Sequence, residues 1–123
     1  MKTVILSVNS RFIHTLLAPR YLKANSAGFD VEILETNVNI RPFEVLSQLY
    51  EMRPDVIAVS CYIFNIEYIK GILPEIRTLM PGVKIILGGY EALPELSPLC
   101  DYIVTGEGDL IFKELLQDIR ECR

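Results

Sequence analysis

Five short apolar runs, separated by stretches of helical periodicity, constrain the fold of this chain more than any other feature. The runs span residues 4–8, 31–35, 56–60, 83–87 and 102–104. Between them, apolar side chains recur at helical spacing over 16–27, 42–52, 65–80 and 109–121, and 94–99 forms a shorter helical or irregular piece. Continuous β-branched runs are typical of strands that are covered on both faces. The pattern therefore predicts strands and helices that alternate along the chain.

This alternation runs through the whole chain without an internal linker and predicts a single domain over residues 1–123. Because strand–helix–strand crossovers are right-handed, we expect an α/β fold with a doubly wound, five-stranded parallel sheet and helices on both faces. Such sheets most often have the strand order 2-1-3-4-5 of the flavodoxin-like (Rossmann-like) class. Gly28 is expected to end the first helix, and Pro74 to kink or split the helix over 65–80.

Composition excludes several classes of protein. The chain has 123 residues, is 50% hydrophobic and carries a formal net charge of −4, which argues against intrinsic disorder and against binding to nucleic-acid backbones. No apolar run is long enough to span a bilayer, so we expect no membrane partner. Cys61, Cys100 and Cys122 form neither a CxxC nor a CxxxCxxC motif. Their spacing indicates reduced thiols in a cytoplasmic protein and no metal site.

Candidate ligand-binding segments follow four of the predicted strands, at residues 9–14, 60–65, 88–91 and 105–109. In doubly wound sheets, ligands bind beside the carboxyl ends of the strands, near the switch in strand order. Two of these segments contain glycine pairs, Gly88 with Gly89 and Gly106 with Gly108. Glycine lets a bulky ligand approach the main chain. The sequence therefore predicts a binding site at this edge.

Familiar motifs of nucleotide and catalytic sites are missing from the sequence. There is no GxGxxG after the first strand and no GxxxxGK[ST], which removes the usual basis for dinucleotide or nucleoside triphosphate binding. A phospho-acceptor receiver would need acidic residues where Asn9 and Ser60 stand. His14 has no nucleophile-elbow partner. Glu91 and Glu107 could act as acid or base, or could simply cap helix starts, so we assign no catalytic residue.

The segments 9–14, 60–65, 88–91 and 101–108 together resemble the cobalamin (B12)-binding domains, in particular those at the N-terminus of B12-dependent radical SAM proteins. The resemblance covers essentially the whole chain. It implies that a corrin ring lies across the strand ends and that the nucleotide tail enters a cleft beside the sheet. The candidate cofactor-binding residues are Asn9, Ser10, Arg11, His14, Ser60, Cys61, Tyr62, Gly88, Gly89, Tyr90, Glu91, Thr105, Gly106, Glu107 and Gly108.

The segment after the first strand departs from the common family motif. Many B12-binding domains carry Asp-x-His-x-x-Gly there, and the histidine replaces the cofactor's own base as the lower cobalt ligand. The corresponding positions hold Asn9, Arg11 and His14. An arginine guanidinium has no free lone pair, and His14 occupies the glycine position. The resemblance therefore implies base-off cobalamin without a protein histidine ligand, and the lower face is left to water, an apolar side chain or nothing.

The resemblance also implies that this chain is an N-terminal piece of a longer radical SAM enzyme, and that the piece alone does not catalyse a reaction. A downstream radical SAM domain would hold a 4Fe-4S cluster and S-adenosylmethionine and would carry out methyl transfer or related radical chemistry. The alternatives are a degenerate module that serves as an interaction or docking domain, and a small flavin carrier. We expect Gly89→Val to block cofactor binding in a folded domain, because a branched side chain would occupy the ligand's approach.

Overall fold

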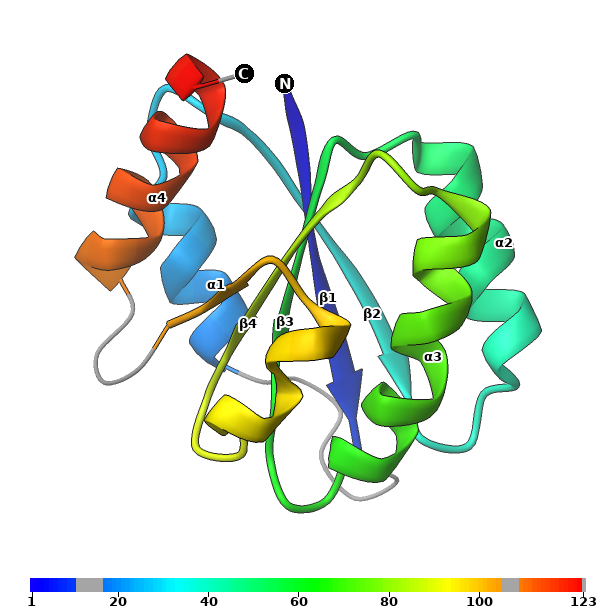
Figure 1. The fold of residues 1–123 in the computed structure, drawn as a ribbon. Coiled ribbons are helices and arrows are strands. Elements are labelled where there is room, and N and C mark those ends of the chain that lie inside the picture. The colour runs from blue at the N-terminus through cyan, green and yellow to red at the C-terminus, as the bar shows by residue number, and fades with distance from the viewer. Residues whose placement is uncertain (11–16, 105–108, 123) are drawn as a thin grey trace.

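The computed structural model describes residues 1–10, 17–104 and 109–122 (Figure 1). Within these residues, five strands form a parallel sheet of order β2-β1-β3-β4-β5. This arrangement confirms the predicted fold class and strand order. The strands are β1 (Lys2–Asn9), β2 (Asp30–Asn37), β3 (Val56–Ser60), β4 (Lys84–Gly88) and β5 (Tyr102–Ile103). The helices are α1 (Leu17–Ala24), α2 (Pro42–Met52), α3 (Ile66–Leu79) and α4 (Asp109–Cys122), with a 3-10 helix η1 (Pro94–Leu99).

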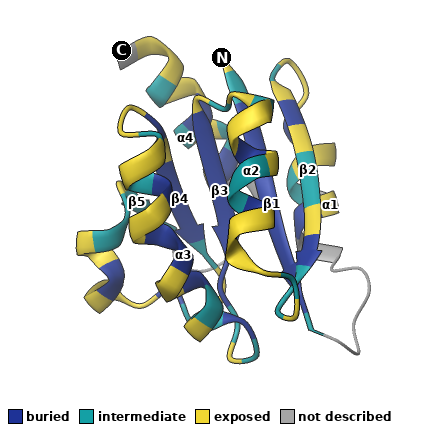
Figure 2. Ribbon diagram, turned by 90° about the vertical axis from the view of Figure 1, so that its right-hand side faces the viewer, coloured by how far each residue is buried: buried dark blue, intermediate teal, exposed yellow. Residues whose placement is uncertain are grey.

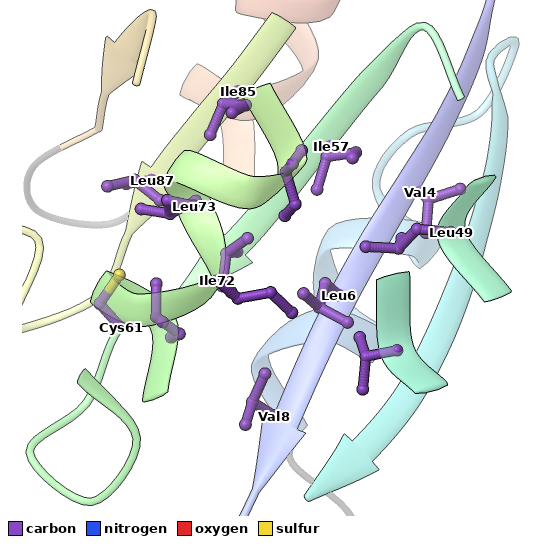
Figure 3. Packing of buried hydrophobic residues seen from close by; sticks show 14 of the residues in the cluster. Val4, Leu6, Val8, Leu49, Ile57, Cys61, Ile72, Leu73, Ile85 and Leu87 are labelled. Atoms are coloured by element: carbon purple, nitrogen blue, oxygen red, sulfur yellow. The ribbon is translucent and has the colours of Figure 1, made fainter. Parts of the chain in front are cut away.

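Helices cover both faces of the sheet, as Figure 1 shows. On one face, α2, α3 and η1 pack against alternate residues of β1, β3 and β4 in the larger hydrophobic cluster (Figure 3). On the other face, a smaller cluster joins the remaining alternate residues to Phe112 and Leu116 of α4, with Leu22 of α1 at its margin. The central strands are therefore buried between two helical layers (Figure 2). Among the described helices, none combines the length and the apolar character that crossing a bilayer requires.

Two helices differ from the sequence-based expectation. The helix expected over 16–27 ends at Ala24, because the chain turns there: the Ser26 N–H donates to the Lys23 carbonyl, and Gly28 adopts a φ of +92°. The helix expected to be divided at Pro74 is continuous from Ile66 to Leu79, so the expected split is wrong. Proline removes only one backbone donor, and buried side chains on either side of it hold α3 against the sheet. These side chains are Ile69, Ile72, Leu73 and Ile76.

An ion pair joins α3 to the sheet at the end opposite the candidate site. Arg77 Nη2 lies 2.6 Å from Asp101 Oδ2, and Arg77 Nη1 donates to the Val83 carbonyl over 2.6 Å. The same carboxylate oxygen accepts the Ile85 N–H at 2.8 Å. Partial burial alone would raise the pKa of Asp101, but the hydrogen bonds from Arg77 and Ile85 outweigh it and hold the pKa below its ordinary value of 3.8.

We expect Asp101→Asn to lower the free energy of unfolding by about 1 kcal/mol at pH 7. Because the folded-state pKa is depressed, the ionised carboxylate stabilises the fold above the unfolded-state pKa. This contribution is lost as the pH falls through the folded-state pKa of Asp101. Urea unfolding at pH 7 and pH 3 should therefore show a difference between variant and wild type that shrinks in acid. Asp118→Asn, on the exposed side of α4, is the control, and an equal difference at both pH values would contradict the assignment.

Candidate functional site

The candidate site lies where the chain reverses its direction of winding across the sheet. β1 pairs with β2 as far as Asn9, whereas its pairing with β3 ends at Leu6 and Val59. The two strands are followed by helices on opposite faces, α1 after β1 and α3 after β3 (Figure 1). This is the topological switch point at which ligands bind in open α/β sheets. The predicted location of the site therefore agrees with the observed topology.

Small and polar residues line one face of the sheet at this edge. Ser7, Asn9, Ser60 and Gly88 alternate with the large apolar residues of the α2/α3 cluster, so they lie on the face covered by α1 and α4. Ser60 and Gly88 are Cα partners in neighbouring strands, and the Ser7 hydroxyl donates to Asn9 Oδ1 over 2.9 Å. On this side, no bulky side chain rises from these four positions near the strand ends.

Gly88 leaves this edge bare. Among the described residues, a Cβ built on Gly88 would meet no atom closer than the Val104 carbonyl oxygen, 3.9 Å away. The backbone of Gly88 is extended as part of β4, and its carbonyl accepts the Cys61 N–H at 2.7 Å. The described part of the chain therefore leaves room for a Cβ at Gly88. This is the property expected of a glycine beside a bound ligand.

Gly89 has a different role, and the reason given for the Gly89→Val expectation is wrong. Its φ is +91°, and a Cβ on it would lie 2.5 Å from the Cys61 carbonyl oxygen and 2.9 Å from the Cys61 nitrogen. The bare Cα therefore faces the neighbouring main chain, and any side chain there would push the two loops apart. Gly89 is required for folding at this point, so its replacement cannot report on the approach of a ligand.

The side chain of Cys61 is buried in the core, so only its main chain takes part in the contacts between the loops at this edge. The thiol lies in the same packed cluster as Ile72, Leu73 and Leu87 (Figure 3). Burial, with smaller contributions from Cys100 and Glu91, raises the pKa of Cys61 to about 12. The Cys61 carbonyl accepts the Glu91 N–H at 3.1 Å. The main chain of Cys61 thus ties the loop after β4 to the end of β3, while the thiol is neutral and inaccessible.

Three of the other predicted positions lie in the loops after β3 and β4. Tyr62 is half-buried, and its ring stacks on that of Phe64 with a centroid distance of 5.5 Å. Tyr90 is 89% exposed at the strand-end edge, and Glu91 is half-buried beside it. Ser10 follows β1 directly and is half-buried. The structure therefore brings Ser60, Tyr62 and the 88–91 loop to one edge.

The remaining predicted positions lie outside the described residues. They are Arg11, His14, Thr105, Gly106, Glu107 and Gly108. Their participation in the site stays a prediction from the sequence.

Asn65 lies in the predicted 60–65 segment, but sequence reasoning did not single it out as the residue that joins the strands at the switch point. Its side chain is buried, and Nδ2 donates to the Val8 carbonyl at 2.9 Å and to the Ser60 carbonyl at 3.2 Å. Its Oδ1 accepts the Tyr62 N–H at 2.8 Å. One amide therefore holds the ends of β1 and β3 and the turn that follows β3. The only signal in the sequence was an asparagine at the start of a helix, which is more often a simple cap.

Comparison with known proteins identifies the family. The family model described as B12 binding domain matches residues 6–116. A cobalamin-dependent radical SAM methyltransferase, TokK of Streptomyces tokunonensis, is 31% identical over 71 residues, which cover 53% of this chain and 10% of that protein. A 2-(S-pantetheinyl)-carbapenam-3-carboxylate methyltransferase of Streptantibioticus cattleyicolor is 33% identical over 70 residues, covering 51% and 10%. The matches thus span about a tenth of the length of these two relatives.

Solved structures agree with this fold. A cobalamin-binding protein from Desulfitobacterium hafniense DCB-2 superposes with a TM-score of 0.72 at 15% identity, over 94% of this chain and 57% of that one. A CheY-like protein from Pseudomonas aeruginosa PAO1 superposes with a TM-score of 0.69 at 12% identity, over 98% and 94%. At such identities the superpositions show the fold alone, which hosts several functions. The family is shown by the match of the B12 binding domain model to residues 6–116. This chain belongs to the B12-binding domain family.

Proposed function

We propose that this chain binds cobalamin in its base-off form at the carboxyl ends of β1, β3 and β4, with the nucleotide tail on the α1/α4 side of the sheet. The observation that carries the proposal is the pairing of Ser60 with Gly88, where a small hydroxyl stands beside a glycine with open space in the direction of its missing side chain. The opposite face at the same level is closed by the large side chains of the core. We therefore place the tail on the α1/α4 side, where the side chains of Ser60 and Gly88 are small or absent.

The residues at this edge suit an uncharged contact with a macrocycle. Serine and asparagine side chains and loop N–H groups can hydrogen-bond the amide groups of a corrinoid, and Tyr62 and Phe64 supply apolar ring surface. When bound, cobalamin would supply a methyl carrier or a redox centre, since such chemistry belongs to the cofactor. The chain's own share is to bind the ring, to orient it and to exclude water from one of its faces.

The base-off form without a histidine ligand is supported by the absence of a histidine at position 11, where the common family motif has one. The common motif would place a histidine where Arg11 stands, and a guanidinium cannot donate a lone pair to cobalt. In the common family motif, the histidine that binds cobalt comes from the segment after β1, the same segment that carries Arg11 here. We infer that in this chain the nucleotide tail is displaced into the protein without a histidine taking its place.

The larger enzyme is also a proposal. The two matched methyltransferases are about ten times longer than the matched segments. We propose that this chain works beside a radical SAM domain that holds a 4Fe-4S cluster and S-adenosylmethionine, and that the pair transfers a methyl group or carries out related radical chemistry. We place this enzyme in the cytoplasm, because Cys61 and Cys100 are both free thiols and reduced thiols are typical of that compartment.

Replacement of Gly88 by valine tests the site. We expect the Gly88→Val variant to fold, since its Cβ has open space and valine suits a strand. The branched side chain should fill the position beside Ser60 and weaken cobalamin binding at least tenfold, a loss of about 1.4 kcal/mol or more. Binding is measured by titration with hydroxocobalamin, followed through its visible spectrum, after urea unfolding has confirmed stability.

Gly82→Val is the matched control, because Gly82 is an exposed turn glycine and a Cβ built on it has no atom of the described chain within 4 Å. It lies at the opposite end of the sheet, before β4, and should bind as the wild type does. A folded Gly88→Val variant with wild-type affinity would contradict the assigned site. A wild-type chain that stays colourless after desalting would contradict cobalamin binding itself and favour a degenerate docking module. Release of FMN on heating would instead favour a flavin carrier.

A further inference from the structure

The central strand β3 carries small side chains on the side of the sheet where we place the nucleotide tail. Ser60 lies on that side at the end of β3. Ala58, two residues earlier, lies on the same side, about 6.6 Å further down, because side chains alternate along a strand. Ala58 is 4% exposed and belongs to the smaller hydrophobic cluster, beneath α4. It is therefore the first core residue that a group passing Ser60 along β3 would meet.

The neighbours of Ala58 in the sheet are both larger than Ala58 itself. Ala58 is the Cα partner of Ile5 in β1 and of Ile86 in β4, and all three residues belong to the smaller cluster. The alanine is the low point of this row, because its side chain is a single methyl group between two isoleucines. A flat ring that enters beside Ser60 and Gly88 would therefore reach deepest over Ala58.

A buried hydroxyl without a partner lies one row further down on the same side of the sheet. Thr3 is the Cα partner of Val56, which precedes Ala58 by two residues, and Thr3 is fully buried. Within the described part of the chain, its Oγ1 is the one buried side-chain polar atom that has no hydrogen-bond partner. A buried hydroxyl left unpaired is costly, and a polar ligand atom that reaches past Ala58 would satisfy it.

We propose that Ala58 sets the size of the base that the nucleotide tail of a bound corrinoid can carry. The inference rests on the proposed function and adds a specificity-determining residue to it. In the base-off form, the base leaves cobalt and enters the protein with the tail, so its far edge packs against the first core row that it reaches. A single methyl group there leaves room for the second ring of a benzimidazole, whereas a branched side chain would occupy that space.

The Ala58→Val variant tests this role with three corrinoids that share one ring system. Hydroxocobalamin carries a two-ring base, the cobamide of p-cresol carries a one-ring base, and cobinamide carries none. We expect the variant to bind hydroxocobalamin at least about tenfold more weakly than the wild type, because small differences in fit within an apolar pocket have effects of this size. Its affinity for the p-cresol cobamide should fall by less than about threefold, and its affinity for cobinamide should be unchanged. Each affinity is measured by titration followed through the visible spectrum.

Ala92→Val is the matched control, because Ala92 is also a 4% exposed alanine but belongs to the cluster on the opposite face of the sheet. It should leave the ratio of cobalamin affinity to cobinamide affinity at the wild-type value. Ala58→Ser adds one atom where valine adds two, so it should lower this ratio by about threefold and replaces the valine variant if that variant does not fold.

The failures of the two proposals are distinguishable. An equal loss of affinity for all three corrinoids, or wild-type affinity for hydroxocobalamin in a folded Ala58 variant, would overturn the role of Ala58. A wild-type chain that binds neither hydroxocobalamin nor cobinamide would instead overturn the proposed function.

Discussion

Replacement of Gly89 by alanine is expected to destabilise the domain by about 3 kcal/mol or more. Two effects add at this position. A residue with a Cβ is strained at a φ of +91°, and the Cβ itself would lie 2.5 Å from the Cys61 carbonyl oxygen. The atoms in the way are main chain, so they cannot rotate aside. Relief requires the loop after β4 to move away from β3, which breaks the bond from the Glu91 N–H to the Cys61 carbonyl.

Two other glycines separate these effects. Gly28 has nearly the same φ, +92°, but no atom of residues 1–10, 17–104 or 109–122 lies within 4 Å of a Cβ built on it. Gly28→Ala therefore measures the backbone cost alone, about 1 kcal/mol. Gly71 lies exposed within α3, and Gly71→Ala should stabilise the domain by about 0.5–1 kcal/mol. Urea unfolding of all three variants gives the comparison. A Gly89→Ala loss no larger than that of Gly28→Ala would show that the close contact with Cys61 is not formed.

Replacement of Asn65 by alanine is expected to lower the free energy of unfolding by about 2–4 kcal/mol. The change leaves the Tyr62 N–H and the carbonyls of Val8 and Ser60 without the partner that they have in the native fold. Because these groups lie at a buried position, water replaces the lost hydrogen bonds only in part. The ends of β1 and β3 are no longer joined, so the loss should be accompanied by weaker binding at this edge.

Replacement of Asn65 by aspartate tests the same hydrogen bonds through the pH dependence of stability. It keeps an oxygen for the Tyr62 N–H, but at neutral pH it turns a second oxygen toward two carbonyls. Burial raises the folded-state pKa of such a carboxyl above its unfolded value, so Asn65→Asp should be least stable at neutral pH and approach the wild type as the pH falls. Asn39→Asp, at an exposed turn, should change stability by less than about 0.5 kcal/mol. A pH-independent deficit in Asn65→Asp would contradict the role of the amide donor.

Much of the architecture could be predicted from local patterns. Continuous β-branched runs require cover on both faces, and alternation with helices then requires a parallel sheet. The strand order follows from these rules and is confirmed. The edge that carries the site follows from them as well and stays a prediction. Helix ends were less accurate, since the turn at 25–29 depends on hydrogen bonds from Ser26 and on the φ of Gly28. The effect of Pro74 on the helix was overestimated, because the burial of neighbouring side chains on α3 offsets the loss of one backbone hydrogen bond.

The roles of individual residues at the site depended on neighbours distant in sequence. Gly88 and Gly89 are indistinguishable as letters, yet one faces open space and the other faces the main chain of Cys61. Cys61 follows Ser60 directly, but side chains alternate along an extended chain, so the Cys61 thiol enters the core and Ser60 lies on the α1/α4 side. Asn65 gained its role because two strands far apart in sequence end beside it.

The sequence by itself determined the class of fold and the order of the strands, and it predicted the edge at which a ligand would bind, because these follow from periodicity, handedness and short-range propensity. The tertiary structure alone decided which glycine faces the main chain of Cys61, which side chain is buried and which amide joins the strands. Those outcomes depend on close contacts between main-chain atoms of segments that no local pattern relates. The clearest example is the close approach of Gly89 to the main chain of Cys61, which only the tertiary structure reveals.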